Sequence, residues 1–191
     1  MNLTITAGGG SSGSLPSSSE SYKGLKATSY IYITGGTFNI NSKDDCIHSN
    51  GTITISSGTY TLSSGDDGVH ADTDLAISGS ATKLTINKSY EGIEATNVVI
   101  TGGTISLVAT DDGINAAGGN NSSSTPGNKR PGMGSFSSSS GSIKILGGTI
   151  YIKMSGDGID ANETLSITAE VLPLLQVWHR ILVRLLRREL L

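Results

Sequence analysis

Acidic residues recur in this sequence at a spacing that could hold metal ions. An Asp or Glu stands directly before a turn glycine, or before Cys46 in one case, at five regularly spaced places, and a lysine fills the first equivalent place. We call this set the turn column: Lys23, Asp45, Asp67, Glu91, Asp112 and Asp157. A further aspartate precedes three of them, at Asp44, Asp66 and Asp111. Three residues after each member lies a second polar set, the strand column: Lys26, His48, His70, Glu94, Asn115 and Asp160.

Carboxylates stacked in this way need a counter-charge. Two unit charges about 4 Å apart repel by roughly 4 kcal/mol at an effective dielectric near 20. Calcium suits such a stack, because it takes six to eight oxygen ligands from carboxylates, carbonyls and water. We therefore predict calcium as the cofactor, with these candidate ligands: Asp44, Asp45, Asp66, Asp67, Glu91, Glu94, Asp111, Asp112, Asn115, Asp157 and Asp160. The competing interpretation is that Asp-Asp-Gly is only good turn chemistry.

Zinc is the less favoured metal. Cys46, His48 and His70 are the candidate nitrogen and sulfur ligands in this region, and we do not expect them to assemble an ordinary tetrahedral site.

A repeat of about 22 residues must position these side chains. The turn column advances in steps of 22, 22, 24, 21 and 45, and the last step contains a Gly/Ser/Asn-rich insertion. Each unit alternates polar and apolar residues over short runs separated by Gly-containing turns, as in Thr52–Ile55, which is typical of strands with one buried face. No stretch of 10–15 residues between these runs has helical periodicity, so βαβ crossovers are excluded.

Three short strands per repeat predict an all-β fold, a right-handed single-stranded parallel β-helix (solenoid) with one repeat per coil. Equivalent residues would then stack about 4.8 Å apart. One predicted stack is apolar and points inward: Ile47, Val69, Ile93, Ile114 and Ile159. Another predicted stack consists of small residues: Ser49, Ala71, Ala95, Ala116 and Ala161.

Composition limits the partners and the location. The net charge is −3, although four of the 13 basic residues lie between 180 and 188, so a nucleic-acid partner is not expected. The single cysteine cannot form an intrachain disulfide. No export signal is visible and the chain begins in mid-pattern, which favours a piece of a longer extracellular or cell-surface protein.

Three segments depart from the repeat. Residues 8–21 and 117–142 are Gly/Ser-rich and are predicted to be loops of a β-helix domain that spans residues 1–168. Residues 169–191 are suddenly rich in Leu and Arg, with helical spacing after Leu174. This tail is either a short C-terminal helix that caps the solenoid, an amphipathic helix on a membrane surface, or out-of-frame sequence.

Four stretches resemble a bacterial family of carbohydrate-binding domain-containing proteins: LTITAGGGS (3–11), YKGLKA (22–27), KSYEGIEA (88–95) and ITGGTISLVATDDGINAAGG (100–119). The resemblance covers roughly residues 1–168. It implies a calcium-loaded parallel β-helix similar to family 9 polysaccharide lyases, located outside the cell, that binds cellulose and acidic sugars. The family pattern would continue beyond Thr168 with more coils, so this chain looks like a truncated or frameshifted member.

Three functions compete. The first is a non-catalytic module that binds polysaccharide, either cellulose or an acidic plant polysaccharide such as pectate, as a monomer without a membrane span. The second is a calcium-dependent pectate-type lyase, for which Lys43, Lys88 and Lys153 are the available bases. The third is a structural or adhesin solenoid. We favour the module and expect no catalytic residue.

Overall fold

The computed structural model describes residues 1–12, 21–116 and 140–168. All regular elements in these residues are β-strands, which confirms the predicted all-β class for the described part of the chain. The strands are β1 (Asn2–Ala7), β2 (Leu25–Ala27), β3 (Tyr30–Ile33), β4 (Thr37–Ser42), β5 (Ile47–Ser49), β6 (Thr52–Ile55), β7 (Thr59–Ser64), β8 (Val69–Ile77), β9 (Lys83–Lys88), β10 (Ile93–Ile100), β11 (Thr104–Val108), β12 (Ile114–Ala116), β13 (Ser142–Ile145), β14 (Thr149–Lys153), β15 (Ile159–Ala161) and β16 (Thr164–Ile167).

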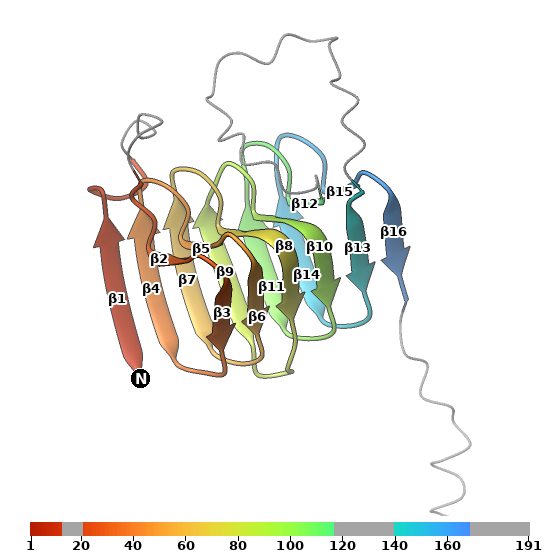
Figure 1. Ribbon diagram of the computed structural model, residues 1–191, viewed down its shortest axis with the longest axis horizontal. Helices are drawn as coiled ribbons and strands as arrows, with labels where there is room; N and C mark the ends of the chain where they lie inside the picture. Colours follow the sequence, from red (N-terminus) through yellow and green to blue (C-terminus); the bar gives the residue numbers. More distant parts are fainter. Residues whose placement is uncertain (13–20, 117–139, 169–191) are drawn as a thin grey trace, which may run out of the picture.

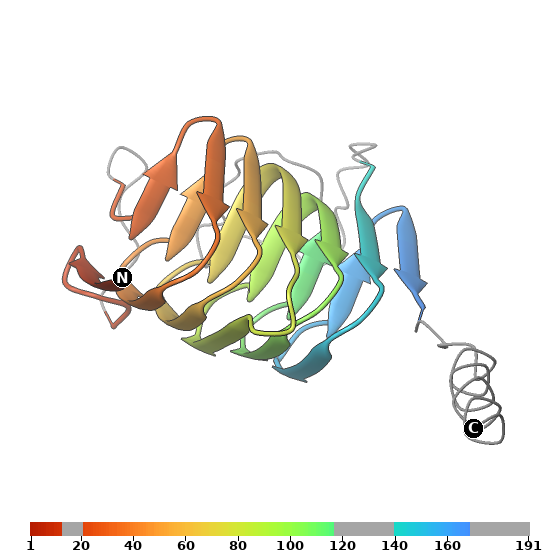
Figure 2. The same ribbon diagram turned by 90° about the horizontal axis from the view of Figure 1, so that it is seen from below.

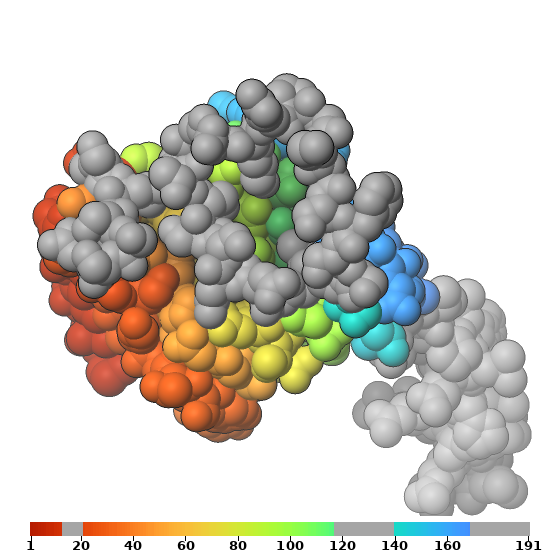
Figure 3. All heavy atoms as spheres, turned by 45° about the horizontal axis from the view of Figure 1, so that its top comes forward, coloured from red at the N-terminus to blue at the C-terminus, as the bar shows by residue number. Residues whose placement is uncertain are grey.

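The described strands form two sheets in which neighbouring strands run parallel. One sheet has the order β1-β4-β7-β9-β11-β14. The other has the order β15-β12-β10-β8-β5-β2, and β13, β16, β3 and β6 join it beside the long strands β8 and β10. Successive repeats therefore lie side by side, from the first at one end of the molecule to the last at the other (Figures 1 and 2). The space-filling view shows the same sequential order (Figure 3).

Strand register follows the sequence repeat. Thr37 pairs with Thr59, Thr59 with Lys83, and Lys83 with Thr104, which reproduces the repeat steps residue by residue. Alternate residues of β4 and β7 are buried and exposed, so period-two patterning places one face of each strand in the core.

The core consists of apolar columns that run across the repeats. The predicted inward stack is confirmed, since Ile47, Val69, Ile93 and Ile114 are fully buried and lie in register, although Ile159 at the last repeat is only half-buried. Phe38 and Tyr60 stack with ring centroids 4.9 Å apart and planes 4° apart, which extends the core toward the first repeats.

Close approach between repeats explains the turn glycines. A Cβ built on Gly92 would lie 2.4 Å from the carbonyl oxygen of Gly113, and one on Gly113 would lie 2.5 Å from that of Gly158. Cys46 replaces one of these glycines and is fully buried, with its sulfur 3.2 Å from the Ser42 hydroxyl oxygen. Burial raises the pKa of this thiol, so the structure places Cys46 as a packed residue.

Parts of the predicted domain plan fall outside the described residues. This holds for most of the two Gly/Ser-rich loops and for the whole tail after Thr168, including its predicted helix. Within the described residues, no helix is long and apolar enough to cross a membrane.

Candidate metal centre

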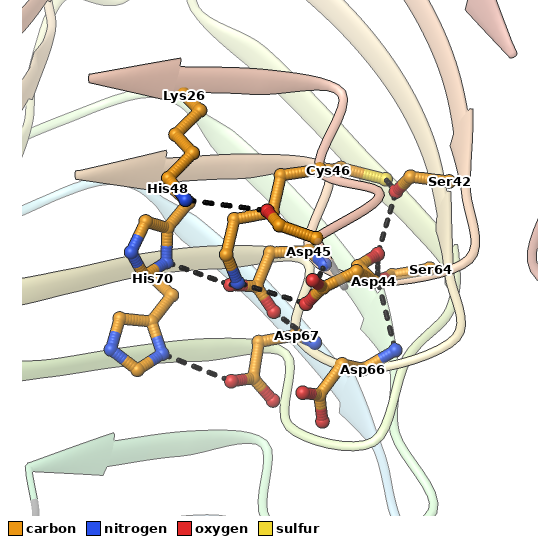
Figure 4. A network of polar contacts seen from close by, with 12 residues as sticks. Lys26, Ser42, Asp44, Asp45, Cys46, His48, Ser64, Asp66, Asp67 and His70 are labelled. Carbon is orange, nitrogen blue, oxygen red and sulfur yellow. Dashed lines mark hydrogen bonds and ion pairs between the residues drawn. The ribbon is translucent and has the colours of Figure 1, made fainter. Parts of the chain in front are cut away.

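The strand column lies in register across six strands. Lys26 on β2 pairs with His48 on β5, and the series continues through His70, Glu94, Asn115 and Asp160. His48 and His70 lie on neighbouring strands, with the aspartates of the adjoining turns beside them (Figure 4). The alignment predicted from the repeat is thus confirmed, while a ligating role for these residues stays a prediction.

Backbone and side-chain hydrogen bonds join the turns of the turn column. The amide N–H of Cys46 donates to the carbonyl of Asp67, and that of Gly68 donates to the carbonyl of Glu91. In addition, the Asp45 carboxylate accepts from the backbone N–H of Asp67 at 3.0 Å, and the Asp67 carboxylate accepts from that of Glu91 at 3.1 Å. Each carboxylate therefore stands over the next turn, which brings the acidic side chains close together.

The chain itself neutralises the first acidic cluster, Asp44, Asp45 and Asp66. The Lys23 ammonium lies 2.8 Å from Asp44 Oδ1 and 2.5 Å from Asp45 Oδ2. The His48 Nδ1 atom lies 2.8 Å from the same Asp45 oxygen. Burial alone would raise the pKa of Asp45, but the contacts with His48 and Lys23 outweigh this effect and lower it. Burial, followed by the charges of Asp45 and Asp44, raises the pKa of Asp66 to about 7.

The second cluster is formed by Asp67, His70 and Glu94. His70 Nδ1 lies 3.1 Å from Asp67 Oδ2 and 2.8 Å from Glu94 Oε2. Burial alone would lower the pKa of His70, but the hydrogen bonds to Asp67 and Glu94 outweigh this effect and raise it to about 12. Burial raises the pKa of Asp67 well above its usual range, despite its contact with His70.

The third group, the Glu91–Asn115 pair, has unmet hydrogen-bonding capacity. Asn115 Nδ2 donates to Glu91 Oε1 at 3.0 Å. The remaining side-chain oxygens of the pair, Glu91 Oε2 and Asn115 Oδ1, are buried and have no hydrogen-bond partner among the described residues. Glu91 is 5% exposed and Asn115 7%. Burial, followed by the nearby Glu94 charge, raises the pKa of Glu91 to about 8.

The last repeats continue the columns with greater exposure. Asp112 accepts from the backbone N–H of Asp157 at 2.7 Å, and a Cβ on Gly156 would approach the carboxylates of both Asp111 and Asp112. Burial, followed by a hydrogen bond with Asp111, raises the pKa of Tyr90. Asp157 is exposed and Asp160 half-buried. Neither belongs to a compact group of three His, Cys, Asp or Glu ligands in the described part of the chain.

Three groups bring ligand atoms within 4.8 Å of one another: Asp44 with Asp45 and Asp66, Asp45 with His48 and His70, and Asp67 with His70 and Glu94. These clusters could hold a metal ion. The sequence interpretation placed His48 and His70 in the strand column but left them out of the candidate calcium ligands. The structure brings both of them to the neighbouring carboxylates.

The side chains of the three lysines considered as bases form no ion pair with the acidic clusters in the described residues. Lys43 Nζ stands 5.0 Å from the centroid of the Tyr22 ring, and Lys88 Nζ donates to the carbonyl of Ser11. Lys153 is exposed at the end of β14.

The stacked parallel sheets and the buried carboxylate clusters define an all-β protein with candidate metal sites between its repeats. A protein-family model described as "Carbohydrate-binding domain-containing protein" matches residues 1–68 and 51–131, so the chain belongs to that family. No curated protein and no solved structure matches this chain.

Proposed function

We propose that this chain is a non-catalytic extracellular module that binds polysaccharide, cellulose or an acidic plant polysaccharide such as pectate, on a parallel β-helix stiffened by calcium. Membership of a carbohydrate-binding family supports the sugar partner. The parallel pairing of each strand with its equivalent one repeat on supports the β-helix.

The Glu91–Asn115 pair is the main structural support for calcium as the cofactor. Within the described residues, Glu91 Oε2 and Asn115 Oδ1 are two buried acceptors without a donor, and a buried polar atom left unpaired costs about 1–3 kcal/mol, more when it is charged. A bound cation would supply the positive charge that these oxygens lack. The donors are oxygens, and Asp111 and Asp112 supply further carboxylates beside the Gly156 backbone of the following repeat. An all-oxygen, acidic donor set of this kind suits calcium.

Two exposed tyrosines offer a surface for the sugar. Tyr30 and Tyr32 on β3 are 56% and 60% exposed, because the alternating Ile31 and Ile33 face the core. Their rings lie with centroids 6.3 Å apart and planes 22° apart, and the Tyr30 hydroxyl lies 3.4 Å from that of Thr54. Aromatic faces with a polar edge suit sugar rings, which present C–H groups on their faces and hydroxyls around their rims.

Binding to insoluble cellulose and to pectate, each with calcium and with chelator, tests the proposal. We expect retention on at least one polysaccharide in calcium. The variant Tyr30→Ala/Tyr32→Ala should reduce retention at least tenfold, while Tyr151→Ala, which removes an exposed tyrosine from β14 in the other sheet, should not. No retention of the wild type on either polymer would refute the module. Ultraviolet absorbance of unsaturated uronate products, measured on the same samples, would instead establish a lyase.

A further inference from the structure

His70 lies where three acidic side chains meet. Its Nδ1 atom faces Asp67 Oδ2 at 3.1 Å and Glu94 Oε2 at 2.8 Å, and its Nε2 atom lies 3.2 Å from Asp72 Oδ1. One ring nitrogen thus has two carboxylate oxygens within contact distance on the same side. A single Nδ1–H can point at only one of them with good geometry.

The three convergent atoms have the separations of ligands around one small cation. Asp67 Oδ2, His70 Nδ1 and Glu94 Oε2 come from a turn and two neighbouring strands, and each lies within 4.8 Å of the others. Zinc binds nitrogen and carboxylate oxygen at about 2.0–2.2 Å, which places tetrahedral ligand atoms about 3.3–3.6 Å apart. The contacts of 2.8 and 3.1 Å are slightly shorter than that separation, so a small outward shift of the side chains would admit the ion.

The opposite side of the imidazole supplies an independent indication. A histidine that binds a metal usually donates its other ring N–H to a carboxylate, which fixes the tautomer and the ring orientation. Asp72 holds this place at Nε2, while Nδ1 faces the two candidate oxygen ligands. The Asp67 side chain is 7% exposed and that of Glu94 is 24%, so the site is open on the Glu94 side, where water could complete the coordination.

We propose that Asp67, His70 and Glu94 form a site for a divalent transition metal of the zinc class, chemically distinct from an all-oxygen calcium site. Imidazole nitrogen suits zinc and its neighbours, whereas calcium prefers oxygen. The strand column changes from His70 to Glu94 to Asn115 in three successive strands, so the donor set changes from mixed nitrogen and oxygen to oxygen alone. This site does not depend on sugar binding or on calcium at Glu91.

Titration of the chelator-treated full chain with Zn²⁺ and, separately, with Ca²⁺ tests the site. Calorimetry measures affinity, and the visible spectrum of added Co²⁺ reports nitrogen ligation directly. His70→Gln should weaken zinc binding at least about 100-fold, and Asp72→Asn should weaken it by about 10- to 100-fold by releasing the ring. Neither variant should change the response to calcium.

Matched variants separate this site from the others. His179→Gln makes the same substitution at the remaining histidine outside the columns and should leave zinc binding unchanged. Glu91→Gln should remove the calcium response and retain zinc. If His70→Gln does not fold, Asp72→Asn and the cobalt spectrum of the wild type still test the proposed site. Zinc affinity equal to wild type in both His70→Gln and Asp72→Asn, no zinc binding to the wild type, or full displacement of zinc by equimolar calcium would overturn the assignment.

Discussion

The two ends of the acidic columns balance their charge in different ways. In the first repeats, Lys23 and His48 contact Asp45 directly, and Lys23 also contacts Asp44. No described Lys, Arg or His forms an ion pair with Glu91, and Glu91 Oε2 and Asn115 Oδ1 have no hydrogen-bond partner among the described residues. The same repeat therefore produces one cluster with a lysine ammonium of its own and another whose buried oxygens no described side chain satisfies.

This difference follows from a few substitutions in equivalent positions. The turn column begins with Lys23 and the strand column holds His48 and His70, but from Glu91 onward both columns are acidic or amide. A side-chain cation is present whenever the chain is folded, whereas a bound ion stabilises the fold only according to its concentration. The first repeats should therefore fold without metal, and the later repeats should depend on it.

Removing the Lys23 ammonium should reduce the free energy of unfolding more than any other change considered below. Lys23→Met leaves Asp44 and Asp45 without their ammonium in a site where the Asp45 side chain is 2% exposed. Loss of one partner from a buried ion pair costs about 3–5 kcal/mol. Calcium should restore part of this loss, because Asp44, Asp45 and Asp66 then form a buried group of carboxylates without the lysine ammonium. Urea denaturation with calcium and with chelator measures both effects.

Lys26→Met is the matched control for that substitution. Lys26 is exposed and donates a 3.3 Å hydrogen bond to the Ser21 hydroxyl, so the free energy of unfolding should change by less than about 0.5 kcal/mol. Equal destabilisation by the two lysine variants would show that Lys23 does not neutralise the first cluster.

The metal-free protein should lose stability as the pH rises from about 4.5 to 8. The folded state raises the pKa of Glu91 from 4.5 to about 8 and that of Asp66 from 3.8 to about 7. The folded chain then holds protons that the unfolded chain has released, so the free energy of unfolding falls across this window. One pKa unit corresponds to about 1.4 kcal/mol, and we expect a decline of at least that size. Thermal unfolding in chelator at several pH values measures it, and a rise over the same window would contradict the assigned shifts.

Much of this arrangement could be predicted because it depends on period alone. The repeat step fixes which residues stack, and the register of Ile47, Val69 and Ile93 followed from counting. Period does not reveal how side chains pair within a layer. That Lys23 reaches both Asp44 and Asp45, and that His70 lies between Asp67 and Glu94, depends on rotamers that the spacing leaves open. The sequence interpretation therefore treated all the carboxylates as one ladder, whereas the structure divides them into clusters that differ in their lysine, histidine and amide neighbours.

Apart from the matched controls, Glu91→Gln should change the free energy of unfolding least among these variants. The sign of its change is nevertheless the most informative. In chelator at pH 8 this variant should be more stable than the wild type by about 1 kcal/mol, because it removes a buried charge that lacks a partner. The new amide is neutral and can still accept the hydrogen bond from Asn115 Nδ2. In calcium the order should reverse, since the wild type gains binding energy that the variant cannot. Glu163→Gln, the same substitution at an exposed position outside both columns, should leave the calcium response in place. If Glu91→Gln destabilises the chelated protein and keeps the calcium response, then Glu91 is a structural residue and the two ends of the columns do not differ as argued.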